Sequence, residues 1–263
     1  MEQGISNDIK TIFRFLSPET KEGMEFFASD SLGEEYFCFE TEEQIEEYLS
    51  SVSQEFLSQL SYEELETLKF YTGTSYKEIN AIMRRKWNYE ENGLLTKESE
   101  ASYAKTGRDM CGIISKCPSL NMNLKVYRGV SLKQFHDYGI YSLADLKSME
   151  GKYLYDQGFT STSLMRDKSL VGVTNFFTGE RNIEIEYLVP ASCQDGALLL
   201  GNQSSYYDGE AEYLINASNL TKILSVEIDE QNNKAFIRAM LIPKMLWDPP
   251  YQMDEQNKNN KMG

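Results

Sequence analysis

The spacing of apolar residues changes from a helical to a strand period near Pro118, and this change constrains the fold more than any other feature of the chain. Before it, apolar side chains recur every three or four positions, which predicts amphipathic helices. The first such series is Ile45, Leu49, Val52, Phe56 and Leu60. After it, short alternating runs predict six or seven strands. A helical first half followed by a strand-rich second half predicts an α+β fold.

The helix starts are predicted by Ser or Thr residues that stand three positions before Glu or Gln, the spacing of a capping box. The three pairs are Thr41 with Gln44, Ser61 with Glu64, and Ser75 with Glu78. Gly73 predicts the C-terminal end of the second helix. A fourth helix is expected over residues 97–116, because it has to end before Pro118. Strands are expected over residues 124–128, 159–163, 183–189, 197–200, 212–215, 223–226 and 235–242.

The chain is expected to form one domain. Residues 1–117 form its helical part, with a helix near residues 75–86 against the core, and residues 118–248 form the β-rich core. Residues 249–263 are polar and are expected to be a flexible tail. No apolar run approaches the roughly 20 residues of a membrane span, and the N-terminus has no signal-peptide pattern, so a soluble protein is expected.

The charge excludes two classes of partner. The chain has 41 Asp and Glu against 26 Lys and Arg, a formal net charge of −15. Such a chain repels nucleic-acid backbones and anionic membrane surfaces, so neither is expected as a partner. The single histidine, His136, and the four cysteines lack metal-ligand spacing, so no metal site is expected. Acid–base chemistry therefore falls to carboxylates rather than to His136.

Arg128 is the first candidate site residue. Side chains alternate along a strand, so Leu124, Val126 and Arg128 share one face and the charge continues an apolar series. Such an arginine either reaches water at the end of its strand or binds an anion. A guanidinium offers a rigid fork that fits phosphate oxygens in pairs, so the functional interpretation is a pyrophosphate anchor.

A hydroxyl run and an acidic pair supply the other candidates. The hydroxyls of Ser161, Thr162 and Ser163 can hold a neighbouring carboxylate in one rotamer. Glu210 and Glu212 fall on one face if their segment is extended, and that proximity should raise the pKa of one of them. Such a pair suits cleavage at an anomeric carbon through an oxocarbenium-like state. This reasoning leaves a glycosidase and an NAD⁺-cleaving enzyme both open.

In combination these motifs resemble a known family. Tyr127-Arg128-Gly129, Ser161-Thr162-Ser163 and Glu210-Ala211-Glu212 are similar, in order and strand context, to the signature of the arginine-specific R-S-E class of mono-ADP-ribosyltransferases. The segment from Tyr71 to Asn80 resembles the helix before the core in the enzymatic components of actin-modifying binary toxins, where two tyrosines and an asparagine contact NAD⁺. Gly158-Phe159 and Val189-Pro190 resemble the family as well, although the usual Pro-x-Gly is a longer segment here, from Pro190 to Gly196.

The resemblance implies split mixed sheets with NAD⁺ in a cleft between them, and no metal. It implies that Arg128 pairs with the phosphates and that Ser161 orients Glu212, which stabilises the ribosyl cation. Glu210 then serves the incoming nucleophile. Further NAD⁺ contacts are expected from Gly129, Tyr71, Tyr76, Asn80, Thr162, Ser163 and Phe176. Tyr206 and Tyr207 are expected to meet the acceptor protein.

The two glutamates resemble the arginine-modifying members, so arginine is the expected acceptor, with threonine left open. The alternatives are an NAD⁺ glycohydrolase, a carbohydrate hydrolase, which leaves Arg128 and Ser161 unexplained, and a non-catalytic interaction protein on the same scaffold. The expected partners are NAD⁺ and an unidentified target protein. The setting fits a translocated effector in a host cytosol, a toxin component, or an enzyme of the producing cell.

Overall fold

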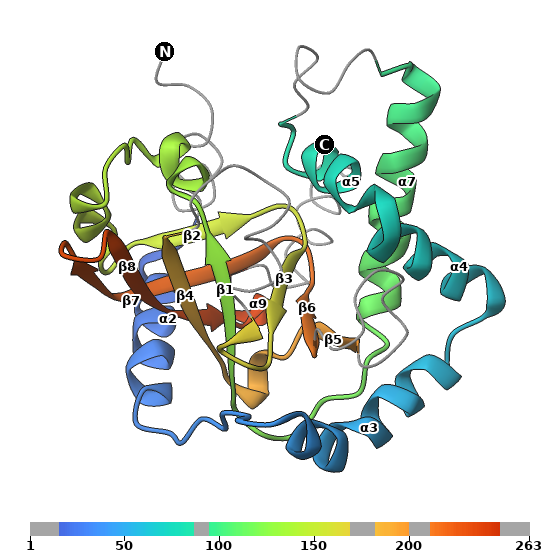
Figure 1. Cartoon of the computed structure of the whole chain (residues 1–263), viewed down its shortest axis with the longest axis horizontal. Coiled ribbons are helices and arrows are strands. Elements are labelled where there is room, and N and C mark those ends of the chain that lie inside the picture. The colour runs from blue at the N-terminus through green and yellow to red at the C-terminus, as the bar shows by residue number, and fades with distance from the viewer. Residues whose placement is uncertain (1–15, 87–94, 169–181, 200–210, 248–263) are drawn as a thin grey trace, which may run out of the picture.

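The computed structural model describes residues 16–86, 95–168, 182–199 and 211–247 (Figure 1). Its α-helices are α2 (Pro18–Ser31), α3 (Glu42–Ser58), α4 (Tyr62–Phe70), α5 (Tyr76–Met83), α7 (Lys97–Ile114) and α9 (Lys244–Trp247). The strands are β1 (Leu124–Val130), β2 (Tyr153–Asp156), β3 (Thr160–Ser163), β4 (Ile183–Val189), β5 (Gly196–Leu199), β6 (Glu212–Ile215), β7 (Asn219–Asp229) and β8 (Lys234–Ile242). This order confirms the predicted α+β class.

The strands form one eight-stranded mixed sheet in the order β2-β7-β8-β4-β1-β3-β6-β5. All neighbours are antiparallel except β4 and β8. The strand β1 pairs with β4 at seven positions but with β3 only at Tyr127 and Ser163, so the expected split corresponds to this narrow junction. Strand β2, four residues that pair with β7, was not predicted.

Two of the three predicted helix caps are confirmed. Thr41 and Ser61 each complete a capping box, with Gln44 and Glu64 respectively. The prediction for Ser75 was wrong, because its side chain makes no capping hydrogen bond. A π-helical turn, η1 (Tyr71–Ser75), carries the chain from α4 into α5, so Gly73 does not end a helix either.

The helices cover the sheet at different places. Figure 1 shows α4, α5 and α7 beside the β3–β6–β5 end, whereas α2 lies across β7 and β8. The first group, together with Phe56 of α3, buries an apolar cluster against β5 and β6 that includes Ile79, Met110 and Leu214. On the other face of β8 from α2, two 3-10 helices, η2 (Leu132–Tyr138) and η3 (Ala144–Met149), pack on β1, β4, β7 and β8.

The described residues contain neither a membrane-spanning helix nor a metal-ligand group. No helix among them combines the length and hydropathy that a membrane crossing requires. Within the same ranges, no group of three or more His, Cys, Asp or Glu side chains could hold a metal ion.

Candidate functional site

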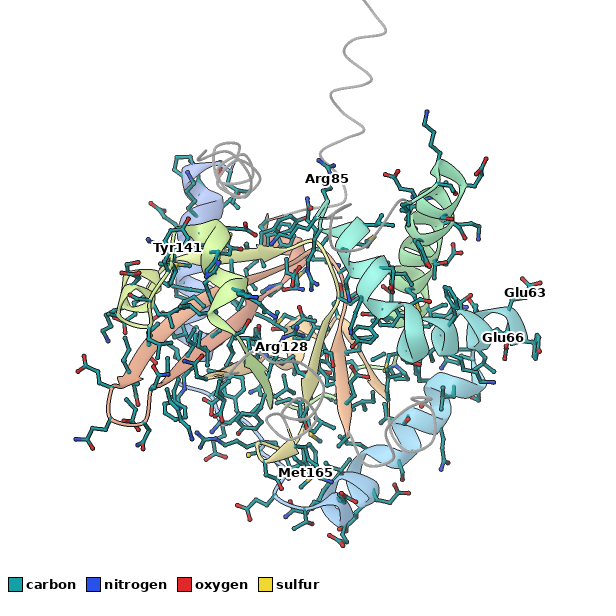
Figure 2. All side chains as sticks on the ribbon, turned by 45° about the horizontal axis from the view of Figure 1, so that its top comes forward. Glu63, Glu66, Arg85, Arg128, Tyr141 and Met165 are labelled. Carbon is teal, nitrogen blue, oxygen red and sulfur yellow. The ribbon has the colours of Figure 1, made fainter. Side chains whose placement is uncertain are left out.

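Arg128 lies where the two parts of the sheet meet. Leu124 and Val126 are fully buried on the same face of β1, and Arg128 continues that face while only half-buried, as predicted. Its Nη1 donates a hydrogen bond of 2.8 Å to the carbonyl oxygen of Ser161 on β3. The guanidinium therefore bridges the narrow junction between β1 and β3, and Figure 2 shows it near the middle of the molecule, whereas Glu63 and Glu66 point outward from α4.

The hydroxyl run lies next to the acidic strand. In the pairing of β3 with β6, Ser161 is opposite Leu214 and Ser163 is opposite Glu212. Residues two apart on a strand share a face, so Ser161, Ser163 and Glu212 project on the same side. Glu212 is buried and Ser161 is exposed. In the described part of the chain the hydroxyl of Ser161 makes no hydrogen bond with Glu212, so its predicted role in orienting that carboxylate remains a prediction.

A hydrogen bond joins Tyr71 and Asn80 next to the start of β3. The amide of Asn80 donates to the Tyr71 hydroxyl at 2.9 Å, and its oxygen accepts from the backbone N–H of Phe159 at 2.7 Å. The rings of Tyr71 and Phe159 meet edge to face, with centroids 5.0 Å apart. Tyr76 is 41% exposed at the start of α5. The π-helical turn that contains Tyr71 is a feature often found at functional sites.

An ion pair that the sequence analysis missed ties α5 to the segment before β3. Arg84 Nε and Nη2 donate to the two carboxylate oxygens of Asp156 at 2.7 and 2.9 Å, and Nη2 also donates to the Phe159 carbonyl at 2.8 Å. Asp156 further accepts from the Gly158 N–H and from the Thr160 hydroxyl. Burial favours the neutral acid, but the charge and hydrogen bonds of Arg84 outweigh it, and the pKa of Asp156 is lowered.

The charges that act on Tyr71 connect these residues into one site. Burial raises the pKa of the Tyr71 hydroxyl most, and the charge of Glu212 raises it further. Arg84 and Arg128 act on the same hydroxyl in the opposite direction. Asn80, Asp156 and two more tyrosines interact with the same groups. We call the whole set the polar cluster, and its members are Tyr71, Asn80, Arg84, Arg128, Tyr138, Asp156, Tyr187 and Glu212.

Several predicted residues are outside this cluster. Glu210, Phe176, Tyr206 and Tyr207 lie outside the described residues. The remaining members of the hydroxyl run have hydrogen bonds of their own. The Thr162 hydroxyl donates to the Tyr213 carbonyl, and the Ser163 hydroxyl accepts from the Met165 N–H.

Gly129 of the first motif and Arg166, which follows the hydroxyl run, both lie beside Glu184 of β4. Gly129 is opposite Glu184 in the pairing of β1 with β4. Arg166, which follows the hydroxyl run, pairs with the buried carboxylate of Glu184 at 2.7 Å. Arg166 is therefore held on β4 in this structure.

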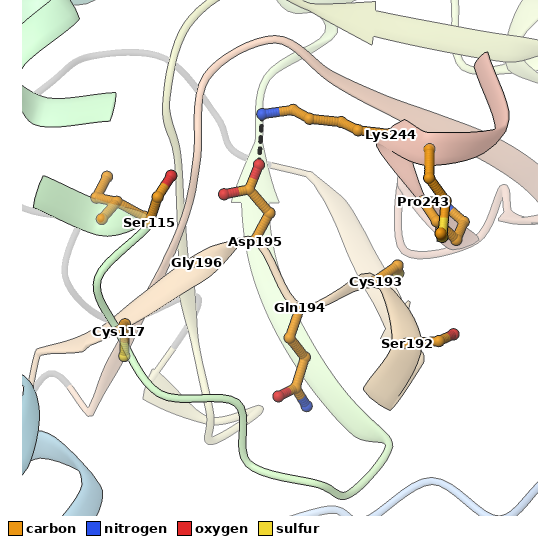
Figure 3. Close-up of a pocket in the computed structure, with 11 residues that line it drawn as sticks. Ser115, Cys117, Ser192, Cys193, Gln194, Asp195, Gly196, Pro243 and Lys244 are labelled. Carbon is orange, nitrogen blue, oxygen red and sulfur yellow. Dashed lines mark hydrogen bonds and ion pairs between the residues drawn. The ribbon is translucent and has the colours of Figure 1, made fainter. Parts of the chain in front are cut away.

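A cavity of about 410 Å³ lies elsewhere, beside β5 and α9 (Figure 3). Asp195 and Lys244 form an ion pair at its wall, and Cys117 and Cys193 line it. Burial raises the pKa of both thiols, which makes them poor nucleophiles,. None of the predicted site residues that the structure describes lines this cavity.

The comparisons with known proteins agree with the site's motifs. A family model described as ADP-ribosyltransferase exoenzyme matches residues 45–244. No curated protein matches the chain by sequence. Among solved structures, the chain is similar to C3stau2 from S. aureus, solved with NAD, at a TM-score of 0.62 and 18% identity over 80% of this chain and 100% of that one.

Two further solved structures are similar. One is the ADP-ribosyltransferase Vis in complex with agmatine, at a TM-score of 0.55 and 16% identity over 81% of this chain and 91% of that one. The other is the enzymatic component C2-I of the C2-toxin from Clostridium botulinum, at a TM-score of 0.57 and 20% identity over 80% of this chain and 50% of that one. At these identities the likeness concerns the fold.

Proposed function

Since the chain belongs to the ADP-ribosyltransferase exoenzyme family, with NAD⁺ as substrate, we propose that it transfers ADP-ribose to arginine side chains of a target protein. The observation that carries the proposal is the juxtaposition of Arg128, Ser161 and Glu212 across the junction of the two sheet halves. The Glu-x-Glu spacing of Glu210 and Glu212 supports arginine as the acceptor. The agmatine complex of Vis supports it as well, because agmatine carries a guanidinium group.

Arg128 binds the pyrophosphate of NAD⁺. A guanidinium has five N–H donors, and within the described residues Arg128 donates to the Ser161 carbonyl through Nη1, so donors remain for phosphate oxygens,. Glu212 is a buried carboxylate, and a negative charge held away from bulk water stabilises the positive charge that develops on the ribose,. These two groups place opposite charges at the two ends of the bond-breaking region.

The reaction has two bond changes. The bond between the nicotinamide nitrogen and ribose C1′ breaks, and its electron pair leaves with nicotinamide. A guanidine nitrogen of the acceptor then forms a bond to C1′, and its proton passes to Glu210. Tyr206 and Tyr207 contact the acceptor protein in this proposal, and water replaces the acceptor in the slower hydrolysis of NAD⁺.

Of the other predicted residues, Tyr71, Tyr76, Gly129 and Phe176 contact NAD⁺ in this proposal. Asn80, Thr162 and Ser163 use their side-chain groups in hydrogen bonds within the protein, so we assign them to positioning. Asn80, for example, holds both Tyr71 and the start of β3.

The test is a reaction of the chain with NAD⁺ and agmatine. We expect release of nicotinamide and formation of ADP-ribosyl-agmatine, measured by mass spectrometry. Labelled NAD⁺ in a cell lysate should mark arginine residues of one or a few proteins. Nicotinamide release without any labelled acceptor would favour the NAD⁺ glycohydrolase, and labelled threonine would show a different acceptor.

A further inference from the structure

Tyr138 and Tyr187 belong to the polar cluster, although no sequence motif singled them out. Tyr138 ends the 3-10 helix η2, and Tyr187 lies in the middle of β4. Both rings pack against the apolar cluster formed by η2, η3 and the strands β1, β4, β7 and β8. Packing of the rings fixes the direction in which the hydroxyls can act.

Tyr187 is a close neighbour of Arg128. In the pairing of β1 with β4, Tyr187 is opposite Val126, and Val126 shares its face with Arg128. Tyr187 and Arg128 are therefore diagonal neighbours on one face, a distance that long side chains span. The charges that act on the Tyr187 hydroxyl agree with this position, since they are those of Arg128, Asp156 and Arg84.

Tyr138 shares the charged neighbours Asp156 and Arg84 with Tyr187. Its neighbour Asp137 forms an ion pair with Lys86, which follows α5, so the end of α5 and the end of η2 meet. Asp156 and Arg84 act on the Tyr138 hydroxyl, and so does Tyr187. The two hydroxyls thus share a set of charged neighbours.

No hydrogen bond joins Tyr138 or Tyr187 to another side chain or backbone group of the described residues. The side chains of Tyr138 and Tyr187 are only half-buried. Burial raises the pKa of Tyr187 to about 12 and also raises that of Tyr138, so both are neutral donors at physiological pH.

We propose that Tyr138 and Tyr187 donate hydrogen bonds to a phosphate group of NAD⁺, beside Arg128. This inference rests on the proposed role of Arg128 as the phosphate anchor. A phosphate oxygen accepts several hydrogen bonds, and neutral hydroxyls beside one guanidinium complete its coordination without adding charge. Two donors on rigid rings are already in place before the ligand arrives, so little side-chain entropy is lost on binding.

The test compares Tyr138→Phe and Tyr187→Phe with the wild type by isothermal titration calorimetry, using NAD⁺ and ADP-ribose as probes. Phenylalanine keeps the ring and its packing and removes only the donor. Tyr155→Phe is the matched control, because Tyr155 packs against Trp247 in a different apolar cluster. A hydrogen bond to a charged group contributes about tenfold or more to affinity, so each test variant should bind both probes about tenfold more weakly.

Steady-state NAD⁺ hydrolysis supplies the second readout. The KM for NAD⁺ should rise about tenfold in both variants while kcat stays within about twofold, because phosphate binding is common to the ground and transition states. Wild-type affinity for both probes in either variant would overturn the inference and leave the proposed function intact. So would weaker binding of NAD⁺ with unchanged binding of ADP-ribose. Wild-type protein that binds neither probe would overturn the proposed function as well.

Discussion

Replacement of Gly158 by alanine is the sharpest test of the way α5 is attached to the core. A Cβ atom at this position would lie 2.7 Å from Arg84 Nε, 2.7 Å from Asn80 Oδ1 and 2.8 Å from Arg84 Cζ. These atoms are not the free ends of flexible side chains. Arg84 is held by Asp156 and by the Phe159 carbonyl, and Asn80 by Tyr71 and the Phe159 N–H. The clash therefore has to break part of this network or displace β3.

The expected loss of stability is that of an overpacked interior, about 1–3 kcal/mol. For a chain of this size a change of 1 kcal/mol shifts the melting temperature by about 2–4 °C, so Gly158→Ala should melt roughly 2–12 °C below the wild type. Displacement of a reacting group by about 1 Å can cost about 100-fold in rate, so NAD⁺ hydrolysis should fall by at least about tenfold.

Gly112→Ala is the matched control, measured by calorimetry and nicotinamide release in parallel. Gly112 lies in α7, and nothing lies within 4 Å of the Cβ that alanine would add. Alanine is the better helix former, so this variant should be unchanged or more stable by about 0.5–1 kcal/mol. If Gly158→Ala melts and turns over like Gly112→Ala, the contact of Arg84 and Asn80 with the Gly158 backbone does not hold α5 in place.

Four further predictions concern the site. Glu212→Gln should reduce both hydrolysis and transfer by at least about 100-fold, and retained nicotinamide release would disprove its role. Arg128→Lys should bind NAD⁺ almost as weakly as Arg128→Ala, because an ammonium cannot bind two oxygens as a fork; wild-type affinity of the lysine variant in a titration would refute this. Glu210→Gln should lose transfer to agmatine and keep NAD⁺ hydrolysis, and equal loss of both would assign Glu210 to bond cleavage instead. Asp156 has a lowered pKa in the folded protein, so its contribution to the free energy of unfolding is present above the ordinary pKa of 3.8 and is lost as the pH falls below that value,. Asp156→Asn should therefore be less stable than the wild type at pH 7, and its stability should decline less steeply in acid.

The local signals of the sequence predicted most of the helices and strands. The capping boxes at Thr41 and Ser61 were correct because both partners lie within four residues. The same spacing failed at Ser75, where the chain stays helical through the turn that buries Tyr71 against Phe159. Strand β2 was missed because its four residues form a strand by pairing with residues 219–222, far along the chain.

The site divides in the same way. The sequence singled out Arg128 as a charge that continues an apolar strand face, Ser161 as part of a hydroxyl run and Glu212 as part of an acidic pair, and all three are local signals. Arg84 and Asp156 were missed because their ion pair joins residues 72 positions apart. One signal was available, since Asn80 and Arg84 are four apart and so share a helix face. No pattern in the sequence indicated that this helix face contacts the segment from Asp156 to Phe159.

The pairing of Arg84 with Asp156 also determines the electrostatic field of the site. Two guanidiniums lie in the polar cluster, and an unpaired Arg84 would add a second positive charge to a site that, in the proposed mechanism, stabilises a positively charged transition state,. Asp156 neutralises Arg84 through both carboxylate oxygens. In the proposed mechanism, Arg128 then remains as the cation for the pyrophosphate, and Glu212 as the anion for the ribosyl cation. On this argument Asp156→Asn should slow bond cleavage by more than its loss of stability explains, because it leaves the positive charge of Arg84 unneutralised in the polar cluster. Comparison of kcat at temperatures where the variant is fully folded separates the two effects, and an unchanged kcat would show that the ion pair serves only to attach α5.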